Sequence, residues 1–192
     1  MRYIRGMEEF RRGYGRDWLD FAATHVGRYT DVRHDLIETP AQLRAWLTEW
    51  GHAPAGSVTE DDVARAQRLR EALHGLARSA ATQTPGSTHD VRLVDQALAD
   101  DAPVGLRRSG TVLTATRPRT ARQALARLAR QAADDLTGPY PTRLRACGDD
   151  ECSGIFADPT GRRRWCADDR CGVKARVRAH RARARQSRDG AS

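Results

Sequence analysis

The sequence predicts an α+β fold in which helices dominate, with one small β-hairpin and a compact four-cysteine module near the C-terminus. Three observations carry this prediction. Most of the first 138 residues repeat apolar side chains at helical spacing, one stretch has strand composition, and all four cysteines lie between residues 147 and 171. With 192 residues, 39% of them hydrophobic, the chain can bury one ordinary core and carry one small extra module.

Capping signals mark where two of the predicted helices begin. Thr39-Pro40-Ala41-Gln42 combines an N-cap, a proline suited to the first helical position and a capping-box glutamine, and this helix is expected to stop near Gly51. Thr59 precedes three acidic residues and a long apolar face, which is the pattern of a longer helix. Both starts are therefore predicted from local signals.

Three further helices are predicted from apolar periodicity alone. They are expected over residues 10–26, 91–98 and 119–136, and Gly13 and Gly15 weaken the start of the first. Together with the two capped helices, they make the first part of the chain predominantly helical.

The predicted hairpin and the predicted domain boundary follow from composition. Residues 104–116 change to strand-type residues around a Ser109-Gly110 turn. The TGPYPT segment, with two prolines and a glycine, then breaks the last helix of the first part. We therefore expect a helical, regulatory or oligomerising domain over residues 1–138 and a second module over residues 143–188.

The absence of a long apolar run bears on the chemistry of the cysteines. The sequence contains no run of about 18 apolar residues and no apolar stretch of signal-peptide length at its start, so a cytoplasmic protein is expected. Thiols stay reduced in that compartment, and clustered cysteines there are more often metal ligands than disulfides.

The cysteine spacing itself is that of a metal site. The four residues follow the pattern Cys147-x4-Cys152-x13-Cys166-x4-Cys171, which is two close pairs joined by a short loop. Four thiolates complete the tetrahedral coordination of one structural Zn²⁺ and leave no position for a catalytic water. Buried cysteines without metal, a redox switch and a catalytic zinc are the weaker alternatives.

The residues between the pairs indicate how the module folds. A turn is expected at Asp158-Pro159-Thr160-Gly161, followed by a return strand over Arg162–Trp165, with Cys171 at the start of a final helix. This order of knuckle, hairpin and helix resembles a treble clef. A segment so short lacks a core of its own, so the metal is expected to supply its folding energy.

Positive charge is concentrated in the final helix. Residues 172–188 hold seven of the basic residues and no acid, in a chain whose formal net charge is +8. Val173, Val177, His180 and Ala184 fall on one face, which is expected to pack on Trp165 and Phe156. The basic residues on both flanks would then project outward, as in a helix that binds phosphates.

The cysteine segment resembles a known zinc finger. The run RRRWCADDRCGVKARVRAHRAR is similar to the CGNR-type finger, although Cys171-Gly172-Val173-Lys174 keeps only the cysteine and the glycine of the motif. Upstream, RDWLDFAATHVGR and WLTEWG resemble the ABATE domain that accompanies this finger. The resemblance implies a bacterial transcription regulator whose finger binds DNA.

The sequence thus predicts a zinc-dependent regulator that binds double-stranded DNA at the nucleoid, with no catalytic site. An RNA-binding module and a purely structural protein-contact module are the alternatives. A small-molecule effector pocket lined by Asp17, Asp20 and His25 is a further hypothesis. The residues expected to contact nucleic acid are Arg162, Arg163, Arg164, Lys174, Arg176, Arg178, Arg181, Arg183 and Arg185.

Overall fold

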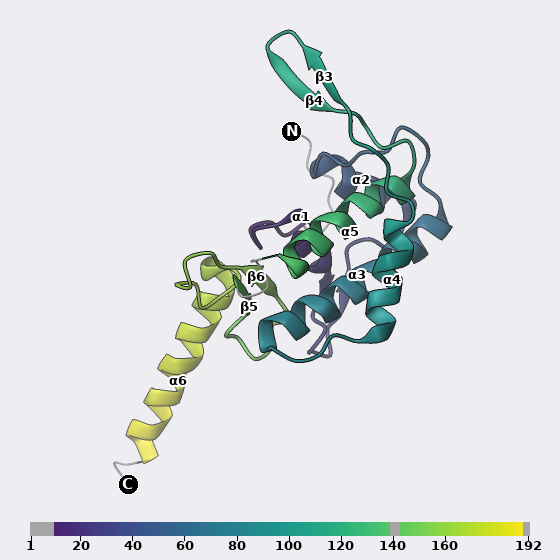
Figure 1. Cartoon of the computed structure of the whole chain (residues 1–192). Helices are drawn as coiled ribbons and strands as arrows, with labels where there is room; N and C mark the ends of the chain where they lie inside the picture. The colour runs from purple at the N-terminus through teal and green to yellow at the C-terminus, as the bar shows by residue number, and fades with distance from the viewer. Residues whose placement is uncertain (1–9, 139–142, 190–192) are drawn as a thin grey trace.

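A computed structural model describes residues 10–138 and 143–189 of the chain. Six α-helices and three two-stranded antiparallel sheets occur within these residues (Figure 1). The predicted class, α+β with helices dominating, is confirmed. In chain order the elements are α1 (Asp17–Ala22), β1 (His25–Val26), β2 (His34–Asp35), α2 (Pro40–Glu49), α3 (Glu60–Thr82), α4 (Thr88–Leu98), β3 (Leu106–Ser109), β4 (Val112–Ala115), α5 (Ala121–Thr137), β5 (Leu144–Ala146), β6 (Ile155–Ala157), a π-helical turn (Asp168–Gly172) and α6 (Val173–Asp189).

Helix α3 is the centre of the helical body, and α1, α2, α4 and α5 all contact it. Its apolar face supplies Leu73, which is fully buried together with Trp18 of α1, Trp46 of α2 and Leu128 of α5. Fully burying an apolar side chain of this size stabilises the fold by roughly 1.5–3 kcal/mol. The amphipathic spacing of the helices is therefore what assembles this core.

The predicted helix starts are confirmed at the level of single hydrogen bonds. Thr39 and Gln42 form a capping box at the start of α2, and Thr59 and Asp62 form another at the start of α3. Gly51, just past the end of α2, has a φ of 76°, a conformation that favours glycine. These ends were predictable because each depends on side chains within four residues of the terminus.

The first predicted helix is much shorter than expected. It covers only Asp17–Ala22, and Val26 lies in β1 instead, paired with His34 of β2. Gly27 explains the change of direction, because its φ is 73° and a Cβ there would lie 2.0 Å from the carbonyl oxygen of Val32. Only glycine permits this turn between β1 and β2.

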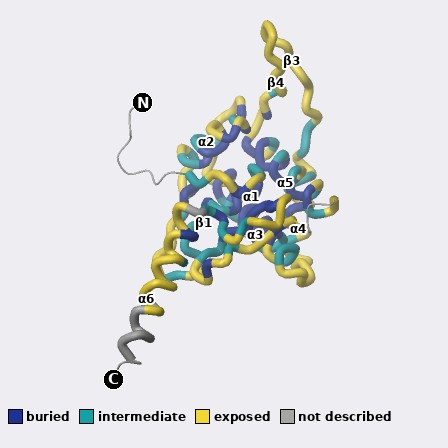
Figure 2. Tube along the Cα trace, turned by 90° about the vertical axis from the view of Figure 1, so that its left-hand side faces the viewer, coloured by how far each residue is buried: buried dark blue, intermediate teal, exposed yellow. Residues whose placement is uncertain are grey.

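The predicted hairpin is confirmed as β3 and β4. Ser109 pairs with Val112, so the turn consists of Gly110 and Thr111, and Gly110 has a φ of 60°. Both strands are exposed along their whole length, and the hairpin projects from the helical body at the end opposite to α6 (Figures 1 and 2).

The cysteine segment packs on the helical body through its own hairpin. Strand β5 pairs with β6, both strands contact α3, and Leu144 and Phe156 belong to the same buried cluster as the tryptophans. The predicted boundary at TGPYPT falls mostly on residues 139–142, which lie outside the described residues. Helix α6 leaves this segment and extends away from the body (Figure 1).

Candidate metal centre and basic helix

Backbone hydrogen bonds hold the four cysteines at the junction of β5, β6 and α6. Cys147 directly follows β5, and its amide donates to the carbonyl oxygen of Gly154 at 2.9 Å. The amide of Cys152 donates to Asp149 at 2.8 Å, which closes the first turn. Cys171 lies in the π-helical turn before α6, where its amide donates to Ala167 at 3.0 Å. The predicted position of Cys171 at the start of the final helix is thus observed.

The four sulfur atoms form one compact cluster. All of them lie within 4.8 Å of one another, and Cys166 Sγ is 3.6 Å from both Cys152 Sγ and Cys171 Sγ. A regular tetrahedron with zinc–sulfur bonds of about 2.3 Å has sulfur–sulfur edges of about 3.8 Å. The cluster therefore fits one tetrahedral Zn²⁺ closely, and the cysteines are free thiols rather than disulfides.

The electrostatics of the cluster also favour a cation. Hydrogen bonds among the thiols lower the pKa of Cys147 and raise the pKa of Cys152 and that of Cys171, so the four groups do not all ionise together without a cation. Four thiolates at this separation repel one another, and a divalent ion removes that repulsion. Backbone amides add positive dipoles, because Gly154 N donates to Cys152 Sγ at 3.3 Å and Cys166 N to Cys147 Sγ at 3.5 Å. With four sulfur ligands, the bound ion would have a structural role.

The predicted return strand over residues 162–165 is wrong. The module's hairpin pairs β5 with β6, and residues 162–165 form an irregular connection instead. The side chain of Asp158 organises it by accepting hydrogen bonds from the amides of Thr160 and Arg163. The amide of Gly148 then donates to the carbonyl oxygen of Arg164 at 2.9 Å, which fixes this connection to the turn between Cys147 and Cys152.

The arginine triplet divides into one residue that maintains the fold and two that face solvent. Arg163 lies over the ring of Phe156 at 4.5 Å, and its Nη2 donates to the carbonyl oxygens of Gly13 and Cys166. Arg162 and Arg164 are exposed, and Arg164 lies over the ring of Trp165. The prediction that Arg163 contacts nucleic acid therefore conflicts with its position, since its guanidinium is already engaged within the protein.

The predicted packing of the α6 apolar stripe is also wrong. Val173 and Val177 are 43% and 41% exposed, and His180 is exposed as well. Phe156 is fully buried, covered by Arg163, so it offers α6 no surface. Helix α6 is held instead by the π-helical turn that precedes it and by an ion pair. This ion pair joins Arg178 to the buried Asp149, in the turn between Cys147 and Cys152, at 2.5 Å.

The other predicted basic residues of α6 lie along an exposed helix (Figure 2). Lys174, Arg176, Arg181 and Arg183 are all exposed, and Arg176 and Arg183 take part in interactions within the protein. The side chain of Arg185 lies outside the described set. Because Arg178 is tied to Asp149, and to Glu151 at 3.5 Å, it serves to orient the helix.

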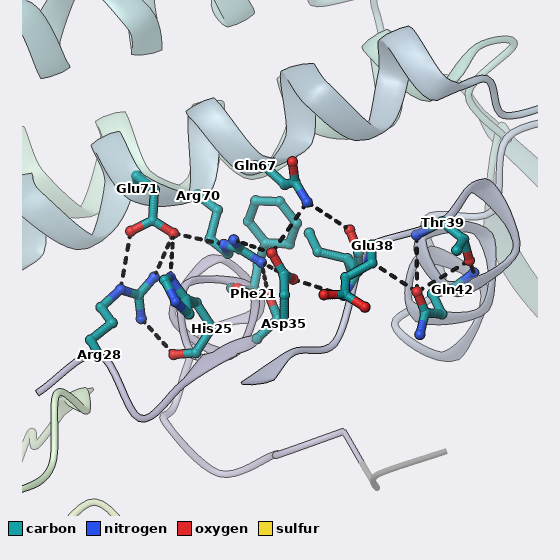
Figure 3. A network of polar contacts seen from close by, with 12 residues as sticks. Phe21, His25, Arg28, Asp35, Glu38, Thr39, Gln42, Gln67, Arg70 and Glu71 are labelled. Carbon is teal, nitrogen blue, oxygen red and sulfur yellow. Dashed lines mark hydrogen bonds and ion pairs between the residues drawn. The ribbon is translucent and has the colours of Figure 1, made fainter. Parts of the chain in front are cut away.

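The predicted effector residues do not line one pocket. A cavity of about 520 Å³ lies between the helical body and the cysteine module, and of the three residues only His25 lines it. His25 is hydrogen-bonded to Glu71, which also holds Arg28 (Figure 3).

The two aspartates have structural partners elsewhere. Asp17 binds His52 at 2.9 Å, and this hydrogen bond keeps the pKa of Asp17 below its usual value. Asp20 is buried, and its burial raises its pKa. It accepts from Trp50 Nε1 at 3.0 Å, so both carboxylates act within the helical body.

Three residues at the site were not identified by the sequence analysis. Asp149 anchors α6, His74 of α3 hydrogen-bonds the carbonyl oxygen of Ser153 at 2.8 Å, and Tyr14 lies beside the sulfur cluster. The only sequence signal for any of them is the pair of glycines that flank Tyr14, which indicates a tight turn.

A helical body joined to a four-cysteine cluster and a basic helix defines a zinc-finger protein with an N-terminal helical domain. Comparison with family models agrees with this class. Residues 15–139 match ABATE, described as "putative stress-induced transcription regulator", and residues 143–184 match the CGNR zinc finger. The chain belongs to the ABATE family and carries a CGNR zinc finger, so the resemblance inferred from the sequence and the prediction of one structural zinc are confirmed.

A search of curated proteins found no match to the chain. No helix within the described residues is long and apolar enough to cross a membrane. Neither matched family is a family of enzymes.

Proposed function

We propose that the protein is a zinc-dependent transcription regulator that binds double-stranded DNA through α6. One observation carries the proposal: a helix that holds seven basic residues and no acid over residues 172–188 leaves the zinc module and extends into solvent (Figure 1). Elsewhere the chain balances its arginines with acidic residues. In this proposal residues 1–138 form the regulatory domain and residues 143–188 form the DNA-binding module. The protein acts in the cytoplasm at the nucleoid.

The dimensions of α6 suit a DNA groove. Its 17 residues make a rod about 25 Å long at about 1.5 Å per residue. Its diameter of about 10–12 Å matches the major groove of B-DNA, which is about 12 Å wide. Cys171 fixes the first turn to the metal cluster and Arg178 fixes the next turns to Asp149, so the helix would enter the groove in a defined direction.

Lys174 and Arg181 are the basic residues best suited to a first test. They lie two turns apart on one face, both are exposed, and neither forms an ion pair with another described residue. Arg162 and Arg164 of the zinc module are the next contacts that we propose, followed by Arg176, Arg183 and Arg185. Arg178 is unsuitable because its substitution would also release the helix from Asp149.

The experiment compares a double variant, Lys174→Ala with Arg181→Ala, with the wild-type protein on duplex DNA at several salt concentrations. Each phosphate contact contributes about −0.9 to the slope of log K against log salt, so the slope should become shallower by about 2. Arg107→Ala with Arg108→Ala is the matched control, since it removes the same charge from the exposed β3 strand at the opposite end of the molecule.

The outcomes separate the three candidate functions. DNA affinity that falls in the α6 variant and not in the hairpin control supports the proposal. Equal losses in both variants would mean that net charge alone attracts DNA, and α6 would not be the contact surface. Stronger binding of single-stranded RNA of equal length would favour an RNA-binding module, and no salt-dependent nucleic-acid binding would favour a protein-contact module.

A further inference from the structure

The hairpin of β3 and β4 presents large apolar side chains to solvent. Leu106, Leu113 and Val112 are 74%, 66% and 58% exposed, and Val104, just before the hairpin, is 52% exposed. The hairpin projects beyond the helical body, and both of its strands are exposed (Figure 2). A hairpin of two strands is marginally stable in water by itself, whereas three or more strands with an apolar face form a stable sheet. The hairpin is therefore suited to gain further strands from a partner.

The register shows which backbone groups of β4 are available to a partner. The amide of Thr116 donates to the carbonyl oxygen of Gly105 at 2.8 Å, so these two residues form a hydrogen-bonded pair at the base of the hairpin. Such pairs alternate with non-hydrogen-bonded pairs along antiparallel strands, and Leu113 and Ala115 belong to the non-hydrogen-bonded pairs. Their amides and carbonyl oxygens therefore point away from β3. In the described part of the chain, no strand other than β3 pairs with β4.

Charge distinguishes the two edges of the hairpin. Strand β3 carries Arg107 and Arg108, whereas β4 carries no charged residue. Charged side chains protect exposed strand edges against pairing, so the edge of β3 is protected and the edge of β4 is not. If two copies of the chain paired through β3, four arginines would come together. Pairing through β4 keeps the arginines on the two outer edges, so the charge pattern favours this edge for contact with a second copy.

Strand β4 is also complementary to itself. In an antiparallel pair of β4 strands centred on Thr114, Leu113 of each copy lies opposite Ala115 of the other, so a large side chain meets a small one twice. Leu106 lies opposite Ala115 within the hairpin, which places it on the same face as Leu113. The two copies together would therefore form a four-stranded sheet on which the leucines share one face.

We propose that β4 is a homodimerisation edge, which pairs antiparallel with β4 of a second copy of this chain. The amides and carbonyl oxygens of Leu113 and Ala115 form the hydrogen bonds between the two copies, and Thr114 lies at the two-fold axis. An acidic protein or a nucleic acid would be attracted to Arg107 and Arg108 and would leave the uncharged edge unused. The inference concerns assembly, so it does not depend on whether the protein binds DNA.

The first test measures the mass of the full-length, zinc-loaded protein by sedimentation between about 1 µM and about 1 mM. The wild type should change from monomer to dimer with increasing concentration. Leu113→Lys should raise the dissociation constant of the dimer by at least about 10-fold, because each copy loses an apolar contact and gains a charge at the interface.

Leu106→Lys is the matched control, since it makes the same change at an exposed leucine of the same face on the outer strand. It should change the dissociation constant far less than Leu113→Lys does. A wild-type protein that is monomeric over the whole range overturns the proposal, as does an equal loss in both variants. A monomeric protein in which Leu113→Lys weakens binding to duplex DNA would make the hairpin a nucleic-acid contact, and this outcome also overturns the proposal.

A cross-linking experiment tests the register. Residues opposite one another in a non-hydrogen-bonded pair have Cα atoms about 4.5 Å apart, which lies within the range of about 4.4–6.8 Å that a disulfide spans. Thr114→Cys in the zinc-loaded protein should therefore form a disulfide-linked dimer with oxidised glutathione. Ser109→Cys, which is exposed on the outer strand, is the control and should not. Equal cross-linking of the two variants, or none in Thr114→Cys, overturns the proposed pairing.

Discussion

Acid should loosen the contact between α3 and the zinc module through His74. The ring of His74 is buried, and its Nε2 lies 2.8 Å from the carbonyl oxygen of Ser153, so the neutral ring donates there. Burial, together with the charge of Arg28, lowers the pKa of His74 from 6.5 to about 4. The structure therefore keeps this histidine neutral where a histidine of the unfolded chain would take up a proton.

The sign and size of the effect follow from these two values. Because the unfolded chain binds the proton more readily, the free energy of unfolding falls as pH drops below 6.5 and levels off below about 4. For His74 alone the loss between pH 7 and pH 5 is about 2 kcal/mol. The other histidines and the cysteines also titrate on acidification, so a matched variant is required.

His74→Gln is that variant. Its amide can still donate to the carbonyl oxygen of Ser153 but does not titrate. The free energy of unfolding of the variant should therefore fall by about 2 kcal/mol less than that of the wild type over the same pH range. Urea unfolding followed by tryptophan fluorescence at pH 7, 6 and 5 measures the difference, with bound zinc determined in parallel. If both proteins lose the same stability, the neutral, buried state assigned to His74 is wrong.

Two further predictions concern the residues around the basic helix. Asp149→Asn should retain zinc but bind duplex DNA more weakly, as measured by fluorescence anisotropy, because Arg178 loses its partner and α6 loses its fixed direction. The variant carries one more positive charge than the wild type, so tighter binding would show that the orientation of α6 is unimportant. Arg163→Ala should lower the free energy of unfolding by about 2 kcal/mol, since it removes hydrogen bonds to two carbonyl groups and a ring contact. Arg162→Ala should leave stability within about 0.5 kcal/mol of the wild type, and a loss as large as that of Arg163→Ala would contradict the division of the triplet.

Features that depend on neighbouring residues were predictable from the sequence. The capping boxes at Thr39 and Thr59 are such features, because a side chain there bonds a backbone amide three residues away. The metal cluster is another, since the chemistry and spacing of four cysteines restrict what they can do. The hairpin at β3 and β4 follows from local turn composition in the same way.

The overestimated first helix and the misplaced strand show where local patterns mislead. Trp18 and Phe21 have helical spacing, but Val26 shares that spacing only by chance and pairs with His34. Residues 162–165 have a plausible strand composition, yet β6 pairs with β5 instead, and its hydrogen bonds are satisfied there. Periodicity indicates which residues could share a face, but it does not indicate which other segment a strand will pair with.

The sequence by itself determined the helical body, the metal chemistry and the basic C-terminal helix, because these depend on residue type and on spacing of a few positions. Only the tertiary structure decided what each charged or aromatic residue does. Arg163 and Arg178 are drawn into contacts with Gly13 and Asp149, which lie 150 and 29 positions away. Tyr14 lies beside the sulfur cluster because the Gly13 and Gly15 turn lies against β6. Contacts between such distant positions form only when the chain folds around its core, so local sequence patterns do not predict them.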